Sequence, residues 1–375
     1  METIKINFVM YSTGRTGGTR TLLNYVKELA NLGHEVTITS MYYSHWFDLP
    51  ESVTIISKNT KFSLYLFYAK SLYARKVGKT NIDYHITILK KLYHMSPKSD
   101  INVATFFPTA YVASWLKEKS VPFYTLMHMP EYFAADEIEK QFFYDTLFLK
   151  LHSTVNSSWL QNRVFEETGL KFPMINMGAT DTKIFYPLIK PLDKKNGNID
   201  IVALGKGGFK NSMGIFESIQ KVRREIPYRK IKLHYFGSKP PKGIAFDGSL
   251  NFFHRNLSDE DLAELYRKSD IQVTFSNAES FPLPPLEAMA CGCPVITTPY
   301  GVEDYVVDGE NAIIVQPGNK DILAAKIRML VEDKGLREKL ANNGVKTAKR
   351  FDYHSQTKML EAEMKKAMYQ NATRD

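Results

Sequence analysis

The chain alternates two hydrophobic patterns from its start. Residues 4–11 (IKINFVMY) form a short apolar run typical of a buried strand. Residues 19–33 (TRTLLNYVKELANLG) carry apolar side chains at helical spacing and end on Gly33, a suitable helix C-cap. Residues 34–40 (HEVTITS) predict a second strand. A strand, a helix and a strand in this order predict a parallel sheet with helices on both faces.

The alternation stops once and then restarts. Residues 186–198 (YPLIKPLDKKNGN) are rich in proline, lysine, asparagine and glycine, which predicts a linker. A strand over 199–205 and a helix over 214–226 follow it. A chain of 375 residues is too long for one ordinary core. We therefore expect two α/β domains in series, with ligands bound beyond the carboxyl ends of the strands.

Composition indicates a globular protein, with 44% hydrophobic and 24% charged residues. No apolar run approaches the length of a membrane span, and the N-terminal run lacks a basic leader and a small-residue cleavage site. Cys291 and Cys293 are separated by one glycine, a poor spacing for a disulfide and unlike a zinc-ligand pair. They predict reduced packing residues in a cytosolic protein.

The net charge of +9 is concentrated in residues 58–98, where nine basic residues accompany one acidic residue, Asp83. Aromatic residues are interleaved with the basic ones, as in 61–76 (KFSLYLFYAKSLYARK). One interpretation is a solvated helix face over an ordinary core. The other is a surface that docks on anionic lipid or on an anionic acceptor. No nucleic-acid-binding motif is present, and we expect no nucleic-acid partner.

Two glutamates flank a proline-rich turn in residues 277–299 (NAESFPLPPLEAMACGCPVITTP). Glu279 follows a predicted strand, and Glu287 is expected in the first turn of the next helix, where proline is tolerated. A helix N-terminus favours a diphosphate, and Glu287 could then accept hydrogen bonds from sugar hydroxyls. Locally, dipole compensation by Glu287 and a solvated loop position for Glu279 explain the pattern as well.

Residues 279–318 (ESFPLPPLEAMACGCPVITTPYGVEDYVVDGENAIIVQPG) resemble the signature of glycosyltransferase family 4, which are retaining enzymes of the GT-B fold. The resemblance implies two Rossmann-like domains that face each other across a cleft. It implies an acceptor domain over 1–187, a donor domain over 188–355 and a last helix, 356–375, that crosses back to the first domain.

The same resemblance implies roles for the residues of the motif. Glu287 would hold the ribose hydroxyls of a nucleotide sugar, and Glu279 would be an electrostatic and positioning group at the transferred sugar. Ser280, Phe281 and Leu283 would contact the donor. The family often has Glu-Gly-Phe-Gly where this chain has Glu-Ser-Phe-Pro at residues 279–282. The last of these, Pro282, has no amide hydrogen. This departure concerns the identity of the sugar more than the reaction.

Three further segments resemble family segments. Residues 204–211 (LGKGGFKN) resemble the loop that holds the donor diphosphate with two cations, here Lys206 and Lys210. Gly17 and Gly18 resemble a Gly-Gly loop near the donor phosphates; the glycine spacing does not fit a dinucleotide fingerprint. His128 resembles a histidine near the reacting carbon, although Met129 replaces the usual acid.

Other segments add smaller expectations. Asn156 and Ser157 would lie at the cleft, and Gly178 would begin the domain crossing. Residues 258–261 (SDED) bring acids together, but Ser258 followed by Asp261 predicts a helix cap rather than a metal site. With no other set of ligand spacing, we expect no metal and no cofactor beyond the donor substrate.

The sequence thus predicts a retaining glycosyltransferase that moves a sugar from a nucleoside-diphosphate sugar to a glycan or lipid-linked acceptor. The setting would be synthesis of cell-surface polysaccharide or glycoconjugate, in the cytoplasm or peripherally on the inner face of the membrane. A nucleotide-sugar epimerase of the same fold is an alternative, although no acid and base for C2 of the sugar can be placed. A non-catalytic sugar- or lipid-binding adaptor is another, against which both glutamates and both lysines speak.

Overall fold

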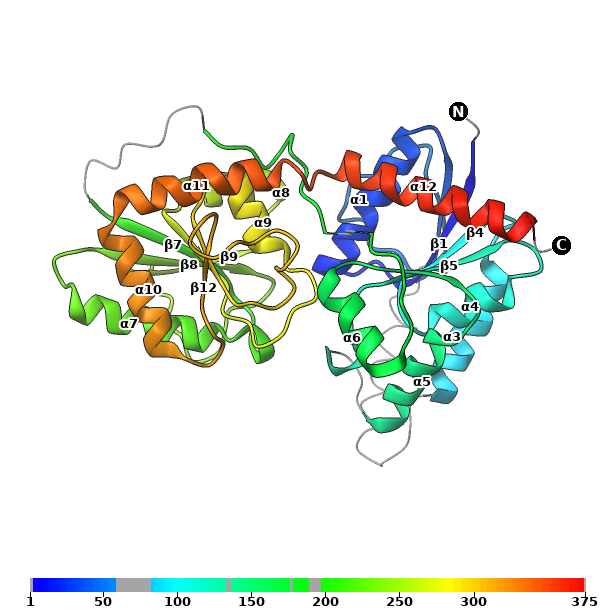
Figure 1. Ribbon diagram of the computed structural model, residues 1–375, viewed down its shortest axis with the longest axis horizontal. Helices are drawn as coiled ribbons and strands as arrows, with labels where there is room; N and C mark the ends of the chain where they lie inside the picture. The colour runs from blue at the N-terminus through cyan, green and yellow to red at the C-terminus, as the bar shows by residue number, and fades with distance from the viewer. Residues whose placement is uncertain (1–2, 59–81, 133–135, 176–177, 189–196, 374–375) are drawn as a thin grey trace. The chain divides into compact units, whose positions relative to one another are not determined.

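The computed structural model describes residues 3–58, 82–132, 136–175, 178–188 and 197–373. The chain divides into two compact units. Unit 1 consists of 1–177 with 353–375, and unit 2 consists of 178–352. Each unit contains a parallel sheet with helices packed on it (Figure 1). Most of the predicted basic segment and most of the predicted linker lie outside the described residues.

Unit 1 has a six-stranded sheet in the order β3-β2-β1-β4-β5-β6. Its strands are β1 Lys5–Ser12, β2 Glu35–Tyr42, β3 Thr54–Ser57, β4 Ile101–Ala104, β5 Val121–Leu126 and β6 His152–Val155. Its helices are α1 Gly17–Asn31, α3 Ile82–Met95, α4 Thr109–Trp115, α5 Glu137–Leu147, α6 Ser158–Thr168 and α12 Tyr353–Ala372. The order reverses between β1 and β4, and such a switch point opens a crevice at the carboxyl ends of the strands.

Helix α1 begins earlier than the hydrophobic pattern predicts. Thr16 caps it by accepting a hydrogen bond from the backbone N–H of Thr19 at 3.2 Å. The cap brings Gly17 and Gly18 into the first turn, so they are not part of a free loop. The helix ends just before Gly33, whose φ of 91° suits a glycine beyond a helix C-terminus.

The last helix, α12, belongs to unit 1. Tyr353 at its start packs edge-on against Tyr25 of α1, with ring centroids 5.6 Å apart. Farther along, Glu361 lies 3.3 Å from Nε2 of the buried His34, and Glu363 lies 2.8 Å from Nε2 of His152. These contacts join the final helix to both the helix layer and the sheet of unit 1.

The unit boundaries fall before those expected from the sequence. The sequence predicts changes at 187/188 and 355/356, whereas the units change at 177/178 and 352/353. Phe185 explains the first difference, because it is 1% exposed in the core of unit 2, 6.4 Å from the ring of Tyr266. Arg267 also donates to the carbonyl of Ile184 at 3.1 Å.

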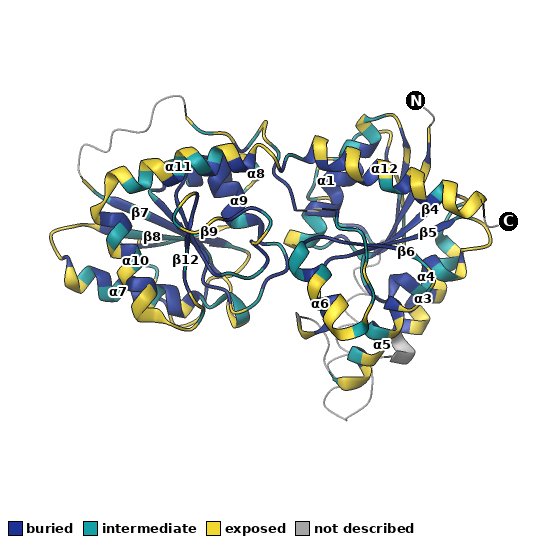
Figure 2. Cartoon of the chain, viewed as in Figure 1, coloured by how far each residue is buried: buried dark blue, intermediate teal, exposed yellow. Residues whose placement is uncertain are grey.

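Unit 2 repeats the architecture with the strand order β12-β11-β10-β7-β8-β9. Its strands are β7 Ile199–Leu204, β8 Ile231–Gly237, β9 Asn251–Arg255, β10 Ile271–Val273, β11 Val295–Thr297 and β12 Ile313–Ile314. Its helices are α7 Ser212–Glu225, α8 Asp259–Lys268, α9 Leu283–Ala290, α10 Lys320–Glu332 and α11 Lys334–Ala348. Here the order reverses between β7 and β10, which are paired directly. Figure 2 shows that the strands of both sheets are buried while the outer sides of the helices are exposed.

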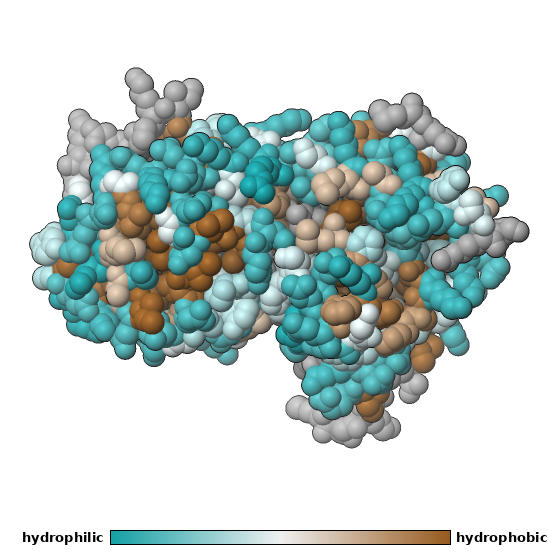
Figure 3. All heavy atoms as spheres, viewed as in Figure 1, coloured by the Kyte–Doolittle hydropathy of each residue, from teal (hydrophilic) through white to brown (hydrophobic). Residues whose placement is uncertain are grey.

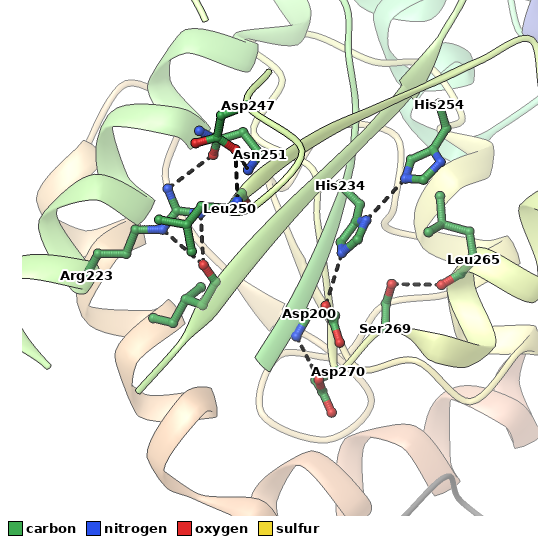
Figure 4. Close-up of polar contacts among 11 residues, drawn as sticks. Asp200, Arg223, His234, Asp247, Leu250, Asn251, His254, Leu265, Ser269 and Asp270 are labelled. Carbon is green, nitrogen blue, oxygen red and sulfur yellow. Dashed lines mark hydrogen bonds and ion pairs between the residues drawn. The ribbon is translucent and has the colours of Figure 1, made fainter. Parts of the chain in front are cut away.

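Polar side chains brace the sheet of unit 2 away from this switch point (Figure 4). Arg223 of α7 donates to the carbonyls of Ile231 and Leu250, at 2.9 Å each from Nη2. A second series of side-chain contacts runs across the strands. His254 lies 3.1 Å from Nδ1 of His234, and Nε2 of His234 lies 3.0 Å from Asp200. These contacts tie neighbouring strands together through side chains as well as backbone.

Neither cysteine forms a disulfide, and both are buried in the core beneath α8 and α9. Burial raises the pKa of the Cys291 thiol to about 12. The face of the molecule in Figure 3 is mostly hydrophilic, interrupted by apolar groups in each unit. In the part of the chain that the structure describes, no helix has the length and apolar character to cross a membrane.

Candidate functional site

Four of the predicted site residues gather at the switch point of unit 2. Lys206 and Lys210 follow β7, and Glu279 and Ser280 follow β10. Because β7 and β10 are adjacent and parallel, their carboxyl ends lie together at one edge of the sheet. Charges on two loops far apart in the sequence are thereby brought to one place.

Hydrogen bonds between side chains and the backbone fix the shape of residues 204–211, which we call the lysine loop. Ser212 accepts a hydrogen bond from the N–H of Lys206 at 2.9 Å and donates to the Lys206 carbonyl at 2.6 Å. The loop turns through Gly208 and Asn211, with φ values of 68° and 53°, a region that glycine and asparagine tolerate. Asn211 then caps α7 by accepting from the N–H of Gly214 at 3.2 Å. The loop is therefore held in shape before any ligand binds.

Phe209 lies against both ammonium groups of this loop. Nζ of Lys210 is 5.0 Å from the centre of its ring, and Nζ of Lys206 is 5.8 Å from it, distances at which a cation is attracted to an aromatic face. Burial lowers the pKa of Lys206, and the charge of Lys210 lowers it further, while Glu279 opposes the shift. The two ammonium groups therefore lie against one ring, an arrangement suited to an anion with more than one negative charge.

Glu279 is buried, with 7% of its surface exposed, and it forms an ion pair with Lys210. Ser276 donates a hydrogen bond to the same oxygen, Oε1, at 2.7 Å. The backbone also links the two loops, because the N–H of Asn277 donates to the carbonyl of Phe209 at 2.7 Å. The carboxylate is thus fixed beside the cations, and it shares Lys210 with any anion that binds there.

The proline turn leads from Glu279 into α9. Pro282 is the N-cap, and α9 begins at Leu283 with the two following prolines in its first turn. Glu287 therefore lies in the second turn, and its expected place in the first turn is wrong. The reason is that the helix starts one residue before Pro284. Glu287 is 2% exposed, and the hydroxyl of Tyr266 donates to its Oε2 at 3.4 Å.

A second loop, residues 301–305, packs against the proline turn. Gly301 has a φ of 67°, and a Cβ atom there would lie 2.5 Å from the carbonyl carbon of Ser280. Tyr305 is 3% exposed and donates to the carbonyl of Pro282 at 3.0 Å. Burial, followed by the nearby carboxylates of Glu279 and Glu303 among others, raises the pKa of Tyr305 well above its usual value. The hydroxyl thus stays protonated and remains a donor.

The predicted residues of unit 1 lie at the corresponding edge of its own sheet. Gly17 and Gly18 follow β1, and His128 follows β5. A Cβ atom at Gly18 would lie 3.7 Å from Nε2 of His128, an ordinary contact distance, so the glycine and the imidazole are neighbours. His128 is exposed. The structure therefore brings these residues together within unit 1.

Asn156 and Ser157, which the sequence predicts at a cleft, are both buried within unit 1. Ser157 caps α6 by accepting from the N–H of Leu160 at 3.1 Å, and Asn156 donates to the carbonyl of Met127 at 3.3 Å. Their polar side chains satisfy backbone groups, which is the commoner use of such residues at the end of a strand.

Among the described residues, no group of three or more histidine, cysteine, aspartate or glutamate side chains is arranged to hold a metal ion. The acids of 258–261 open α8, and Ser258 accepts from the N–H of Asp261 at 3.1 Å.

Three residues that support the site were not predicted from the sequence: Phe209, Ser276 and Tyr305. Phe209 and Ser276 act through contacts within their own loops, with the two lysines and with Glu279, whereas Tyr305 contacts Pro282 of another loop. The only signal for Ser276 is a hydroxyl at the end of a buried strand. For Phe209 it is an aromatic residue between two lysines in a glycine-rich loop.

Comparison with known proteins places the second half of this site in a family. Residues 250–347 match the family model described as glycosyl transferases group 1. The match includes Glu279, Ser280, Glu287 and the supporting loop 301–305, and it stops short of the lysine loop and of unit 1.

Curated relatives are similar over part of the chain. The poly(glycerol-phosphate) alpha-glucosyltransferase of Bacillus subtilis is 29% identical over 205 residues, 50% of this chain and 30% of that protein. The capsular polysaccharide biosynthesis glycosyltransferase CapM of Staphylococcus aureus is 38% identical over 141 residues, 36% of this chain and 37% of that protein. The chain thus spans about a third of the length of these relatives.

Solved structures are similar over nearly the whole chain. The Anabaena protein HepE in complex with UDP and glucose has a TM-score of 0.72 at 15% identity, over 97% of this chain and 100% of that chain. Sucrose-phosphate synthase from Thermosynechococcus elongatus has a TM-score of 0.70 at 18% identity, over 96% and 98%. Residues 250–347 therefore carry a domain of the glycosyl transferases group 1 family, and the two Rossmann-like units have the GT-B fold.

Proposed function

We propose that this protein is a retaining glycosyltransferase that moves a sugar from a nucleoside-diphosphate sugar to a glycan or lipid-linked acceptor. One observation carries the proposal: Lys206, Lys210 and Glu279 converge at the carboxyl ends of β7 and β10. Two cations and one carboxylate at this edge suit a leaving diphosphate beside a developing positive charge. The complexes of HepE with UDP and glucose and with UDP-glucose support the choice of donor.

The lysines would act on the leaving group. When the bond from the sugar to the diphosphate breaks, negative charge grows on the phosphate oxygens, and preorganised cations stabilise it. Lys206 and Lys210 are held by the lysine loop and by Phe209, so little reorganisation is needed. At the start of α9 the N–H of Leu283 adds partial positive charge, while Pro282, Pro284 and Pro285 have no N–H to contribute.

Glu279 would stabilise the positive charge that develops at the reacting sugar. Its burial and its bonds to Ser276 and Lys210 fix its position, which suits an electrostatic and positioning group rather than a mobile nucleophile. In the route that we propose, the leaving phosphate accepts the proton of the acceptor hydroxyl on the same face of the sugar. The configuration at the anomeric carbon is then retained.

Glu287 is proposed to hold the ribose, and its burial against Tyr266 gives it a structural role as well. The two roles can be separated. Glu287→Ala weakens donor binding in both cases, whereas Tyr266→Phe removes only the structural hydrogen bond. Donor affinity that falls equally in the two variants would assign Glu287 to structure alone.

The test of the function is a panel of nucleotide sugars with and without glycan and lipid-linked acceptors. We expect release of the nucleoside diphosphate, and we expect Lys206→Met and Lys210→Met to slow it. The anomeric configuration of the product, read by NMR, tests retention. A new nucleotide sugar would instead indicate an epimerase, and binding without any product would indicate an adaptor.

A further inference from the structure

Three aromatic rings cluster beneath the loop that follows Glu279. The ring centre of Phe281 lies 5.3 Å from that of Tyr305 and 6.2 Å from that of Phe351, and the last two lie 5.9 Å apart. Tyr305 and Phe351 are each 3% exposed. Ring pairs at these separations contribute stability beyond simple burial. We call these three residues the aromatic cluster.

The cluster lies where the chain enters and leaves unit 2. Unit 2 begins at Gly178 and ends at Asp352. A Cβ atom at Gly178 would lie 1.8 Å from Cδ1 of Phe281, so the ring rests directly on the glycine backbone. We call the residues that follow Gly178 the entry segment and those that precede Asp352 the exit segment. A hydrogen bond joins the two, because the N–H of Thr180 donates to the carbonyl of Phe351 at 2.8 Å. The ring of Phe281 thus contacts the entry and the exit segment at once.

The other side of the cluster holds the candidate-site loop, Ser280–Pro282. The hydroxyl of Tyr305 donates to the carbonyl of Pro282 at 3.0 Å. Gly301, four residues before it, packs so closely on the peptide after Ser280 that a Cβ atom would lie 2.9 Å from the N–H nitrogen of Phe281. The loop has no room to shift against this support without moving the cluster.

We infer that Phe281 and Tyr305 are positioning residues that join the candidate-site loop to both segments through which the chain passes between its units. The ring of Phe281 contacts Gly178 and Phe351, and the hydroxyl of Tyr305 donates a hydrogen bond to Pro282. A displacement of the entry or exit segment is then passed to the backbone beside Glu279. The effect on turnover rests on the proposed function; the mechanical link does not.

The first experiment compares Phe281→Ala with the intact protein by hydrogen–deuterium exchange without ligand. We expect faster exchange in peptides that cover 178–185 and 345–352 as well as in the loop itself, because the ring contacts all three. Leu336→Ala is the matched control, since it also truncates a partly buried side chain of unit 2, in a separate core cluster. Faster exchange confined to the loop, or the same pattern in the control, would overturn the inference.

The second experiment measures function. We expect Phe281→Ala to lower turnover by about ten-fold or more, because small displacements of positioned groups carry large kinetic costs. Affinity for the nucleoside diphosphate alone should fall by less than turnover, since the lysine loop and the backbone amide of Phe281 are kept. Phe281→Leu should recover part of the turnover. Tyr305→Phe should lower turnover without faster exchange in 178–185, because it keeps the ring and removes only the bond to Pro282.

A double-mutant cycle tests the link from the entry side. Gly178→Ala places a methyl group where the ring lies, and it should lower turnover. In the Phe281→Ala background the same change should add little, because the ring is gone. Additive losses would show that Gly178 and Phe281 act separately. If the intact protein consumes no nucleotide sugar, the proposed function fails, and the exchange experiment still decides the mechanical link.

Discussion

Glu279 and a bound diphosphate would compete for Lys210, and this competition makes a counter-intuitive prediction. In the free protein Lys210 is already paired with the buried carboxylate of Glu279. We expect Glu279→Gln to bind nucleoside diphosphates more tightly than the intact protein while it turns the sugar nucleotide over more slowly. The substitution removes one negative charge and keeps an oxygen that can accept from Ser276.

The size of the effect follows from the geometry. Two anions that contact the same ammonium lie about 5 Å apart, and an effective dielectric constant of about 20 then gives a repulsion of about 3 kcal/mol per pair of unit charges. Gly207 and Gly208 of the lysine loop are exposed, so solvent and salt reach the site and screen part of this repulsion. A gain of about 1.4 kcal/mol remains, which corresponds to a dissociation constant about ten-fold lower.

The assay is isothermal titration calorimetry with UDP and GDP, at low and at high salt. Glu217→Gln is the matched control, because it makes the same change in net charge at an exposed ion pair with Lys320. We expect the control to bind like the intact protein, and the difference between the two variants to shrink at high salt. A Glu279→Gln protein that binds nucleoside diphosphates with unchanged or weaker affinity would refute the proposed competition.

Three further predictions concern stability in unit 2. Gly301→Ala should lower the free energy of unfolding by about 2 kcal/mol or more, since a Cβ atom would lie 2.5 Å from the carbonyl carbon of Ser280 at a φ of 67°; urea denaturation that shows no loss would contradict this. Arg223→Met should cost about 2 kcal/mol because it removes charged hydrogen bonds to the carbonyls of Ile231 and Leu250, and Arg224→Met is the exposed control. Burial, and then His234, lowers the pKa of His254, so the unfolded chain takes up its proton first and stability should fall as pH drops below 6.5. Melting temperatures measured across that range should fall less in His254→Asn; an equal fall would show that other groups cause it.

The hydrophobic pattern could predict much of the fold because its elements are locally encoded. The first strand and helix of each unit, and the cap of α8 at Ser258, follow from periodicity and short-range hydrogen bonds. The strand orders could not be predicted in the same way, since they depend on pairings between residues far apart, such as Ile201 with Ile271. The unit boundaries moved for the same reason: Phe185 is placed by a long-range contact.

The candidate site divides along the same line. The proline turn marks Glu279 in the sequence, but the ion pair with Lys210 joins residues that are 69 positions apart. Glu287 was misplaced by one turn because a helix boundary depends on the φ and ψ of a single residue, Pro282. The cap at Ser157 could not be predicted, since a polar residue after a strand can face a ligand or cap a helix, and the sequence pattern is the same in both cases.

The two buried cysteines have a practical consequence for experiments on this protein. The chain has no others, and the raised pKa of Cys291 keeps its thiol protonated and unreactive towards alkylating reagents. A single cysteine introduced on an exposed position of each unit, such as Lys334 and Lys117, can therefore be labelled with fluorescent or spin probes without first removing the native thiols. The distance between the two units, with and without a nucleotide sugar, then becomes directly measurable in an otherwise unaltered chain.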